Sequence, residues 1–355
     1  MEFGLSHEFE CPEGYPESQS FTDAFELVDA AEAWGLDAVW LAELHVAPGR
    51  SVLSSPLTVA GAIAARTRRI KIGTAVQILP LCHPLRLAED TATIDQISQG
   101  RLIFGAGRSG FPRAYEAYGI PYAESRDRFA EVLEIVKRAW TEPSFSFDGH
   151  YFHFHDVHLV PRPYQQPHPP IRIAASSPET FEALGTAGYP IFVGARTGTL
   201  SQLAPLIAAY RQAHRAAGHP GDGEVYLRLP VYVADTRELG LGEPEASLMS
   251  FYRGFARRLG DTVNRSGVVH AEERAESALR LESITYAEVQ RDKVAIGSPA
   301  MVVDRLRAID AELGLAGVLL ELNVGNAIPR PRVLNSLRLI CQEVMPGLVG
   351  HAAIA

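Results

Sequence analysis

One short segment pairs a carboxylate with an imidazole at a position where catalysis is common. Glu43-Leu44-His45 follows a short apolar run, so its two ionisable side chains come just after a predicted strand. A carboxylate beside a histidine suits proton transfer, and loops that follow strands carry functional residues disproportionately. The alternative is an ion pair that only stabilises the loop. We take Glu43 and His45 as candidate catalytic residues.

A second segment, from Phe104 to Gly110, matches the spacing GxGxxG. A dinucleotide site would require that this motif open the first βα unit and that a helix begin inside it. The motif instead follows the fourth predicted strand, and we expect a loop from Pro112 to Gly119 after it. A Rossmann-type nicotinamide site is therefore disfavoured, but Arg108 remains as a cation suited to gripping an anion.

A third segment, from Ala175 to Thr180, could bind a phosphate. Ser177 as N-cap and Pro178 at the first helical position predict a strong helix start. The free N–H groups of that helix end and the hydroxyls of Ser176, Ser177 and Thr180 would form an anion site. Plain helix capping is the alternative, and Arg108 on a neighbouring loop would favour the phosphate.

A fourth segment, at about 145–170, interrupts the pattern of strands and helices and is rich in histidine. His153 and His155 would share one face of a strand, which permits a metal site. Aromatic residues alternate with them, however, and no further histidine or carboxylate obviously completes a ligand set. We interpret the segment as a hairpin-like insertion and expect no metal.

The elements that must position these side chains alternate along the chain as short β-rich runs and longer helical patterns. A capping box at Ser20 would open the first helix, and Gly35 would end it. About eight βα units favour a closed barrel whose active site lies in the strand-to-helix loops. We predict an α/β fold, a single (β/α)8 TIM barrel over residues 1–355, with the insertion after the fourth βα unit and a long polar segment before the last strand. Part of that segment, at about 257–293, is a candidate active-site lid.

Composition narrows the class of protein further. The chain has 355 residues, of which 46% are hydrophobic, and a net charge of −9. This balance is typical of a globular protein and disfavours nucleic-acid binding, which needs a basic patch. Three widely spaced cysteines indicate a reducing compartment. Because we find no signal peptide and no apolar run of about 18 residues, we expect a cytoplasmic protein that binds no membrane.

Several segments, in this order, resemble the bacterial luciferase-like flavin monooxygenases and the luciferase α subunit in particular. They are Glu43-Leu44-His45, Gly73 to Val76, His83-Pro84 and Asp95 to Arg101. The resemblance implies a TIM barrel that uses reduced FMN, supplied by a separate flavin reductase, and O2. It further implies a flavin hydroperoxide that oxygenates a small organic substrate, and a homodimer.

The resemblance also implies which residues hold the cofactor. The phosphate would be bound by the same segments that our helix-start argument selected, and a non-prolyl cis peptide would lie beneath the flavin ring. The assigned residues are Arg108, Ser176, Ser177 and Thr180 for the phosphate, Ala75 and Val76 for the cis peptide, and Gly107, Phe111 and Ala174 for the lining of the ring.

Two positions depart from the family pattern. Leu44 replaces the histidine that acts as the base in luciferase, and Gly107 replaces a cysteine close to the flavin. Leucine cannot carry a proton, so His45 would have to take over, and oxygenation of a substrate other than a long-chain aldehyde is expected. Two alternatives stay open: a non-catalytic flavin-binding paralogue, similar to the luciferase β subunit, and an oxidoreductase that uses a deazaflavin.

Overall fold

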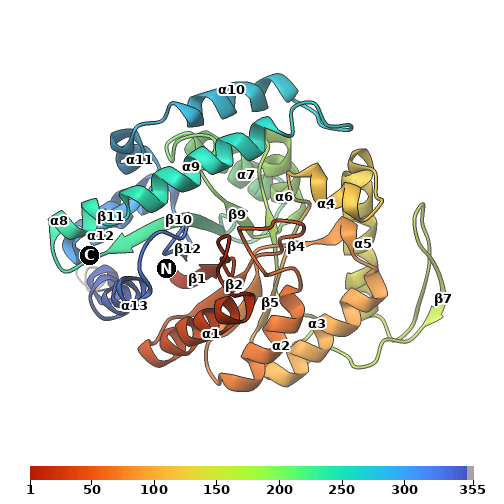
Figure 1. The fold of residues 1–355 in the computed structure, drawn as a ribbon. Helices are drawn as coiled ribbons and strands as arrows, with labels where there is room; N and C mark the ends of the chain where they lie inside the picture. Colours follow the sequence, from red (N-terminus) through yellow and green to blue (C-terminus); the bar gives the residue numbers. More distant parts are fainter. Residues whose placement is uncertain (350–355) are drawn as a thin grey trace.

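The centre of the molecule is a closed barrel of parallel strands (Figure 1). The computed structural model describes residues 1–349, and the pairing of its strands β9 and β10 closes the ring. The barrel confirms the predicted fold class. Its eight strands are β1 (Glu2–His7), β2 (Ala38–Leu41), β3 (Lys71–Thr74), β5 (Leu102–Gly107), β8 (Ile171–Ala174), β9 (Ile191–Val193), β10 (Val225–Val233) and β12 (Gly317–Glu321).

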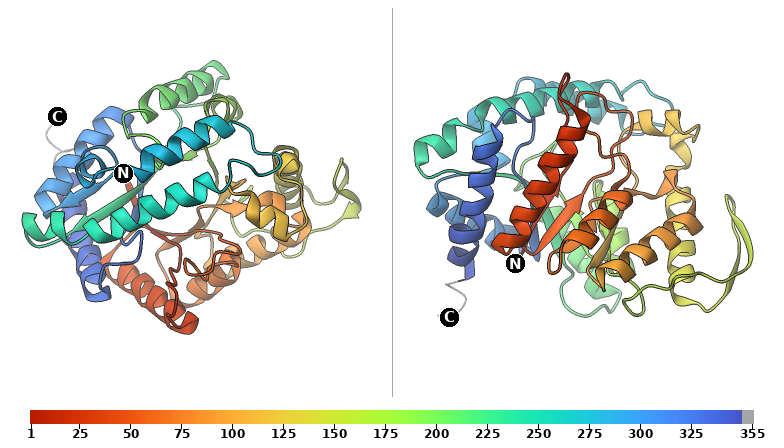
Figure 2. Two further views of the ribbon diagram at one scale, coloured as in Figure 1. Left: turned by 45° about the horizontal axis from the view of Figure 1, so that its top comes forward. Right: turned by 60° about the horizontal axis from the view of Figure 1, so that its bottom comes forward.

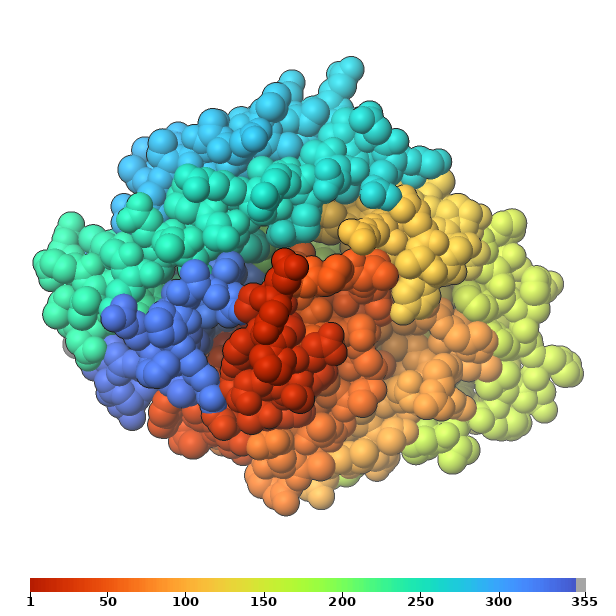
Figure 3. All heavy atoms as spheres, viewed as in Figure 1, coloured from red at the N-terminus to blue at the C-terminus, as the bar shows by residue number. Residues whose placement is uncertain are grey.

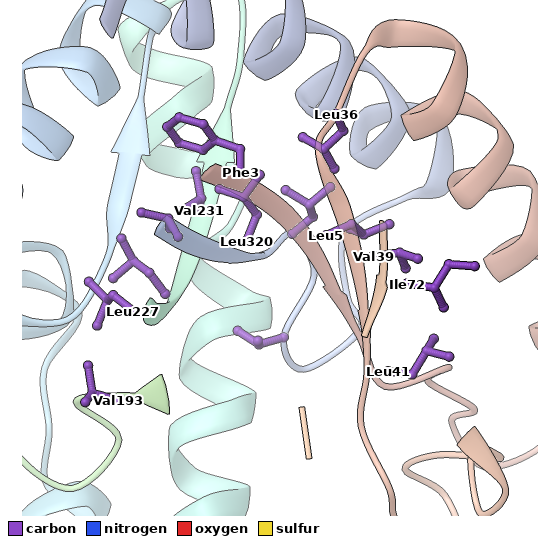
Figure 4. Packing of buried hydrophobic residues seen from close by; sticks show 14 of the residues in the cluster. Phe3, Leu5, Leu36, Val39, Leu41, Ile72, Val193, Leu227, Val231 and Leu320 are labelled. Atoms are coloured by element: carbon purple, nitrogen blue, oxygen red, sulfur yellow. The ribbon is translucent and has the colours of Figure 1, made fainter. Parts of the chain in front are cut away.

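Side chains of each strand alternate between the inside and the outside of the barrel. Phe3 and Leu5 of β1 belong to the buried layer between strands and helices, part of which Figure 4 shows. Gly4 between them leaves room for the indole of Trp40 on β2. A Cβ atom on Gly4, or on Gly73 of β3, would lie 2.1 Å from an atom of that indole. The strands on both sides of β2 therefore need glycine opposite Trp40.

Helices between the strands cover the outside of the barrel (Figure 2). Pro56, Pro84 and Pro178 stand in the first turns of three of them, as predicted, because proline lacks the N–H that would find no acceptor there. The helices of this layer are α1 (Glu17–Trp34), α2 (Pro56–Arg66), α3 (Pro84–Ser98), α5 (Ser125–Thr141), α6 (Pro178–Ala187), α7 (Leu203–Ala216), α12 (Pro299–Leu313) and α13 (Arg330–Leu339), which continues into a π-helical turn (Ile340–Val344) and α14 (Met345–Val349).

Two local expectations are wrong. The first helix begins at Glu17 with Pro16 as its N-cap, so Ser20 lies inside the helix and does not cap it. The chain after β5 is not a loop from Pro112 to Gly119, because Pro112–Ala117 form the short helix α4. Proline explains both differences, since its fixed φ fits the start of a helix and a sequence pattern of caps alone overlooks it.

Two parts of the chain depart from the βα repeat. The strands β6 (Phe145–Asp148) and β7 (His153–Val157) pair antiparallel outside the barrel, which confirms the hairpin-like insertion (Figure 1). The polar segment before the last strand is mostly helical, and α9 and α10 pack against each other there (Figure 2). Its elements are α8 (Arg237–Gly242), α9 (Glu245–Gly260), α10 (Ala271–Glu282), α11 (Tyr286–Asp292) and a short strand, β11 (Ala295–Gly297), that the sequence did not predict.

None of the helices in residues 1–349 is both long enough and apolar enough to cross a membrane.

Candidate functional site at the mouth of the barrel

The candidate residues lie where neighbouring strands of the barrel end. Glu43 and His45 follow β2, Arg108 follows β5, and Ser177 follows β8. Since β2, β3, β5 and β8 are consecutive in the ring, these loops lie side by side at the carboxyl-terminal mouth, where TIM barrels carry their active sites. The structure thus brings the predicted site residues to one end of the barrel.

Glu43 and His45 form a close pair with little access to solvent. The Nε2 atom of His45 lies 2.7 Å from Oε1 of Glu43, and the two side chains are 8% and 5% exposed, respectively. Leu44 between them contributes its backbone N–H to the carbonyl of Leu53. The pair is therefore buried and oriented, as a group that moves a proton would have to be.

The second oxygen of Glu43 is held by the next loop of the mouth. Gln77 Nε2 donates to Oε2 over 2.7 Å, and the backbone N–H of Ile78 donates to the same atom. Burial raises the pKa of Glu43, whereas its hydrogen bonds to His45 and Ile78 oppose that rise. Burial also raises the pKa of Cys82, which contacts Gln77, to about 12, so this thiol stays protonated.

The other ring nitrogen of His45 faces Tyr118. Its Nδ1 atom lies 3.2 Å from the Tyr118 hydroxyl, and the two rings meet edge to face with centroids 5.0 Å apart. If Nε2–H donates to Glu43, Nδ1 is free to accept a proton from Tyr118 or from a ligand. Tyr118 was not among the predicted residues, because it lies 73 positions from His45 in the sequence.

The anion candidates lie after two adjacent strands, with Arg108 after β5 and Ser177 and Thr180 after β8 at the start of α6. Arg108 Nη1 donates to Ser125 Oγ over 2.9 Å, and the Tyr115 hydroxyl donates to the carbonyl of Arg108. The hydroxyls of Ser177 and Thr180 are 2.8 Å apart. Because the Ser177 side chain makes no capping hydrogen bond, capping alone does not account for these hydroxyls.

Arg126 is a second cation near this helix start, and sequence reasoning missed it. It lies in the first turn of α5. The Ser177 hydroxyl holds the pKa of Glu179 below its ordinary value, and the charges of His270 and Arg126 add to that effect. The positive charge of Arg126 thus acts on the first turn of α6. In the sequence, only the position of Arg126 at the start of a helix could have indicated this role.

Next to these anion candidates, small residues pack closely against one another. A Cβ atom on Gly107 would lie 2.4 Å from Val76 Cγ2 and 3.6 Å from Ala174 Cβ. The bond between Ala75 and Val76 is cis, as expected. Phe111 meets Phe255 of α9 edge to face, with ring centroids 6.1 Å apart. Small residues beside an anion site are the surroundings that a flavin with a phosphate tail needs.

The hairpin histidines do not gather into a ligand set. His153 pairs with Asp148 over 2.5 Å and His158 with Asp156 over 3.3 Å, and all four side chains are exposed. Within residues 1–349, no group of three or more His, Cys, Asp or Glu side chains is placed to hold a metal ion.

Comparison with known proteins gives one family and a few full-length relatives. The family described as luciferase-like monooxygenase matches residues 1–316. The oxygenase component of the flavin-dependent trigonelline monooxygenase of Acinetobacter baylyi is 25% identical, over 93% of this chain and 90% of its own. The crystal structure of monooxygenase RslO1 from Streptomyces bottropensis is 28% identical, with a TM-score of 0.78, and covers 98% of this chain and 99% of its own.

A relative with a different cofactor matches a smaller part of the chain. The F420-dependent glucose-6-phosphate dehydrogenase of Kineococcus radiotolerans is 33% identical over 53% of this chain and 57% of its own length.

Proposed function

The chain belongs to the luciferase-like monooxygenase family, and we propose that it is a flavin-dependent monooxygenase that oxygenates a small organic substrate with externally supplied reduced FMN and O2. The observation that carries this proposal is that Arg108 and the hydroxyls at the start of α6 follow the adjacent strands β5 and β8, next to the small residues at Gly107. When reduced flavin is bound, it supplies the electrons and activates the oxygen.

The chain's own residues bind and orient the cofactor. Charged and hydroxyl groups at a helix start hold the phosphate, and the small residues leave room for the ring. The residues in these roles are Arg108, Ser176, Ser177 and Thr180 for the phosphate, and Ala75, Val76, Gly107, Phe111 and Ala174 for the ring.

Glu43 and His45 handle protons in this proposal. Glu43 fixes the ring of His45 through the 2.7 Å contact with Nε2. His45 Nδ1 then accepts a proton from the substrate or from the Tyr118 hydroxyl and returns it later in the cycle. Because Leu44 offers no proton acceptor, His45 is the imidazole on which we place this role.

The segment 257–293 is proposed to close over the mouth as a lid. It contacts the loop after β5, where Arg274 Nη1 donates to the carbonyl of Gly110 over 2.9 Å, and the helix α4, where Arg265 pairs with Glu116. A cover at this place would exclude water from the reaction.

A separate reductase is proposed as the source of reduced FMN. The name of the Acinetobacter relative, an oxygenase component, supports a separate reductase protein. We further propose that the protein is a cytoplasmic homodimer.

The deazaflavin alternative is favoured by the Kineococcus relative, and binding can test it. The protein is titrated anaerobically with reduced FMN and, separately, with reduced F420, and each dissociation constant is measured. We expect FMN to bind at least about tenfold more tightly. Tighter binding of F420 would replace the proposal with a deazaflavin-dependent oxidoreductase.

A further inference from the structure

A second group of charges lies at the barrel mouth, away from the Arg108 loop. Glu8 follows β1, Arg228 is on β10, Glu321 ends β12 and Arg196 follows β9. Arg50, from the loop after β2, and Arg258, on α9, also belong to this group. We call these six residues the arginine cluster. Sequence spacing does not predict it, because its members are contributed by six parts of the chain.

Three of the arginines share two carboxylates. Glu8 accepts from Arg50 Nη2 and from Arg228 Nη2, each over 2.7 Å. Glu321 accepts from Arg228 over 2.7 Å and from Arg196 over 2.6 Å. Although burial alone would raise the pKa of Glu8, the charges of the three arginines hold it well below its ordinary value. Both carboxylates are therefore paired with arginines.

Arg258 adds a fourth positive charge without a partner. Its Nε atom is buried and makes no hydrogen bond within the described part of the chain, and no carboxylate of residues 1–349 forms an ion pair with it. Burial and the charge of Arg50 lower the pKa of Arg258 to about 10, so it stays charged at neutral pH. Burying a charged group without a partner is costly, and such groups are candidates for functional sites.

Neighbouring ionisable groups do not cancel the excess of positive charge in the cluster. Burial and the charge of Glu8 raise the pKa of Glu10 to about 8, so this carboxyl is mostly neutral at pH 7. Burial lowers the pKa of His7 to about 4, so it is neutral as well. Four guanidinium groups thus face two ionised carboxylates.

Two largely buried aromatic rings pack against the cluster. Arg196 lies over the ring of Phe251 at 4.8 Å, and Arg258 lies 5.9 Å from the centroid of Phe255. The two phenyl rings are stacked on the same side of α9. Figure 3 shows a hollow in the surface between α9, in teal, and the N-terminal segments, in red. A ligand bound at Arg258 would meet positive charge next to the ring of Phe255.

We propose that the arginine cluster is the subsite for an anionic group of the organic substrate, a carboxylate or a sulfonate, with Arg258 as its free donor and Phe251 and Phe255 against the apolar part. This inference rests on the proposed function, because it names the substrate class of the same barrel mouth. The flavin phosphate is the other anion to consider, and we place it at Arg108, just after β5, in the part of the ring away from β10, β12 and β1.

Binding of simple acids tests the proposal without knowledge of the natural substrate. Benzoate, benzenesulfonate and neutral benzamide are titrated calorimetrically into the wild-type protein, Arg258→Gln and Arg257→Gln, in which a neighbouring exposed arginine is the matched control. We expect the two acids to bind the wild type at least about tenfold more tightly than benzamide. Arg258→Gln is expected to remove that preference, and Arg257→Gln to keep it.

Three measurements keep the result interpretable. Thermal unfolding of Arg258→Gln should show no loss of stability, since an unpaired charge is removed, and Arg258→Lys should retain most of the acid binding. FMN affinity is measured in the same variants and should not change. Equal binding of acids and benzamide, or acid binding that survives Arg258→Gln, would overturn the proposal. Failure of the wild-type protein to bind FMN, together with an acid preference that Arg258→Gln removes, would instead count against the proposed function alone.

Discussion

The two ring nitrogens of His45 face different partners, with Nε2 2.7 Å from Glu43 Oε1 and Nδ1 3.2 Å from the Tyr118 hydroxyl. This arrangement gives the imidazole a fixed orientation and one nitrogen free to exchange a proton. It places the proton-handling role on one histidine, next to a leucine that cannot share it.

Replacement of His45 by asparagine should therefore impair turnover more than cofactor binding. Asparagine keeps a hydrogen-bond donor toward Glu43 but cannot carry the proton. We expect kcat to fall by roughly 10²-fold or more, with the FMN dissociation constant nearly unchanged. The matched control is His158→Asn in the exposed hairpin. An unchanged kcat would remove His45 from the reaction.

Replacement of Arg108 by glutamine should weaken FMN but not riboflavin. The two flavins differ by the phosphate, which we place against Arg108 and the start of α6. We expect FMN affinity to fall by roughly tenfold or more, the value of a charge-assisted hydrogen bond, while riboflavin binds as before. Arg113→Gln, on the exposed side of α4, is the control. Equal losses for both flavins would show that Arg108 does not contact the phosphate.

Replacement of Gly107 by alanine should crowd the ring site. The new methyl group would lie 2.4 Å from Val76 Cγ2, so one of the two must move. Gly110→Ala, where an added Cβ atom meets nothing within 4 Å, is the matched control. We expect the FMN affinity of Gly107→Ala to be roughly tenfold lower than that of the wild type. Gly110→Ala should have the wild-type affinity, and both are measured by fluorescence titration. The same affinity in both variants would exclude Gly107 from the ring site.

Replacement of Gly73 by alanine should lower stability. Its methyl group would lie 2.1 Å from an atom of the Trp40 ring inside the barrel, and overpacking of this kind costs about 1–3 kcal/mol. Urea denaturation should show that loss in Gly73→Ala. Gly61→Ala on α2, where nothing lies within 4 Å of an added Cβ atom, should be unaffected or stabilised.

Acid binding to the arginine cluster should depend on pH through Glu10. The pKa of this carboxyl is raised to about 8 by burial and by Glu8, so it is neutral below that pH and becomes negative above it. The added charge opposes an anionic ligand, so benzoate affinity should fall as the pH rises through 8. Arg258, whose pKa is about 10, stays charged across this change.

The Glu10→Gln variant tests whether Glu10, and no other ionisable group, causes the pH dependence of benzoate binding. It should bind benzoate with little change between about pH 6 and pH 9, because Gln does not ionise. For the wild type, a raised carboxyl pKa also means that the folded state holds a proton which the unfolded state has lost, so stability should decline as the pH rises toward 8. A wild-type benzoate affinity that is flat over the same range would contradict the role of Glu10.

The sequence predicted local features better than distant groupings. The start of a helix such as α6 at Pro178 is set by neighbouring residues and was predicted correctly, although α4 at Pro112 was missed. The three-residue strand β11 was missed because Ala295–Gly297 is too short to show an alternating pattern. Glu43 and His45 are two positions apart, so their pairing was accessible from the sequence. Tyr118 and the arginine cluster depend on how the barrel closes.

The most direct measurement is the lifetime of the reduced complex in oxygen. Protein and reduced FMN are mixed anaerobically, oxygen is added rapidly, and the flavin absorbance is followed over time. A return to the oxidised spectrum at least about tenfold slower than that of free reduced FMN is the result expected of a monooxygenase that shields its cofactor. Oxidation as fast as in free solution, with tight binding of oxidised FMN, would contradict it and indicate a non-catalytic flavin-binding protein.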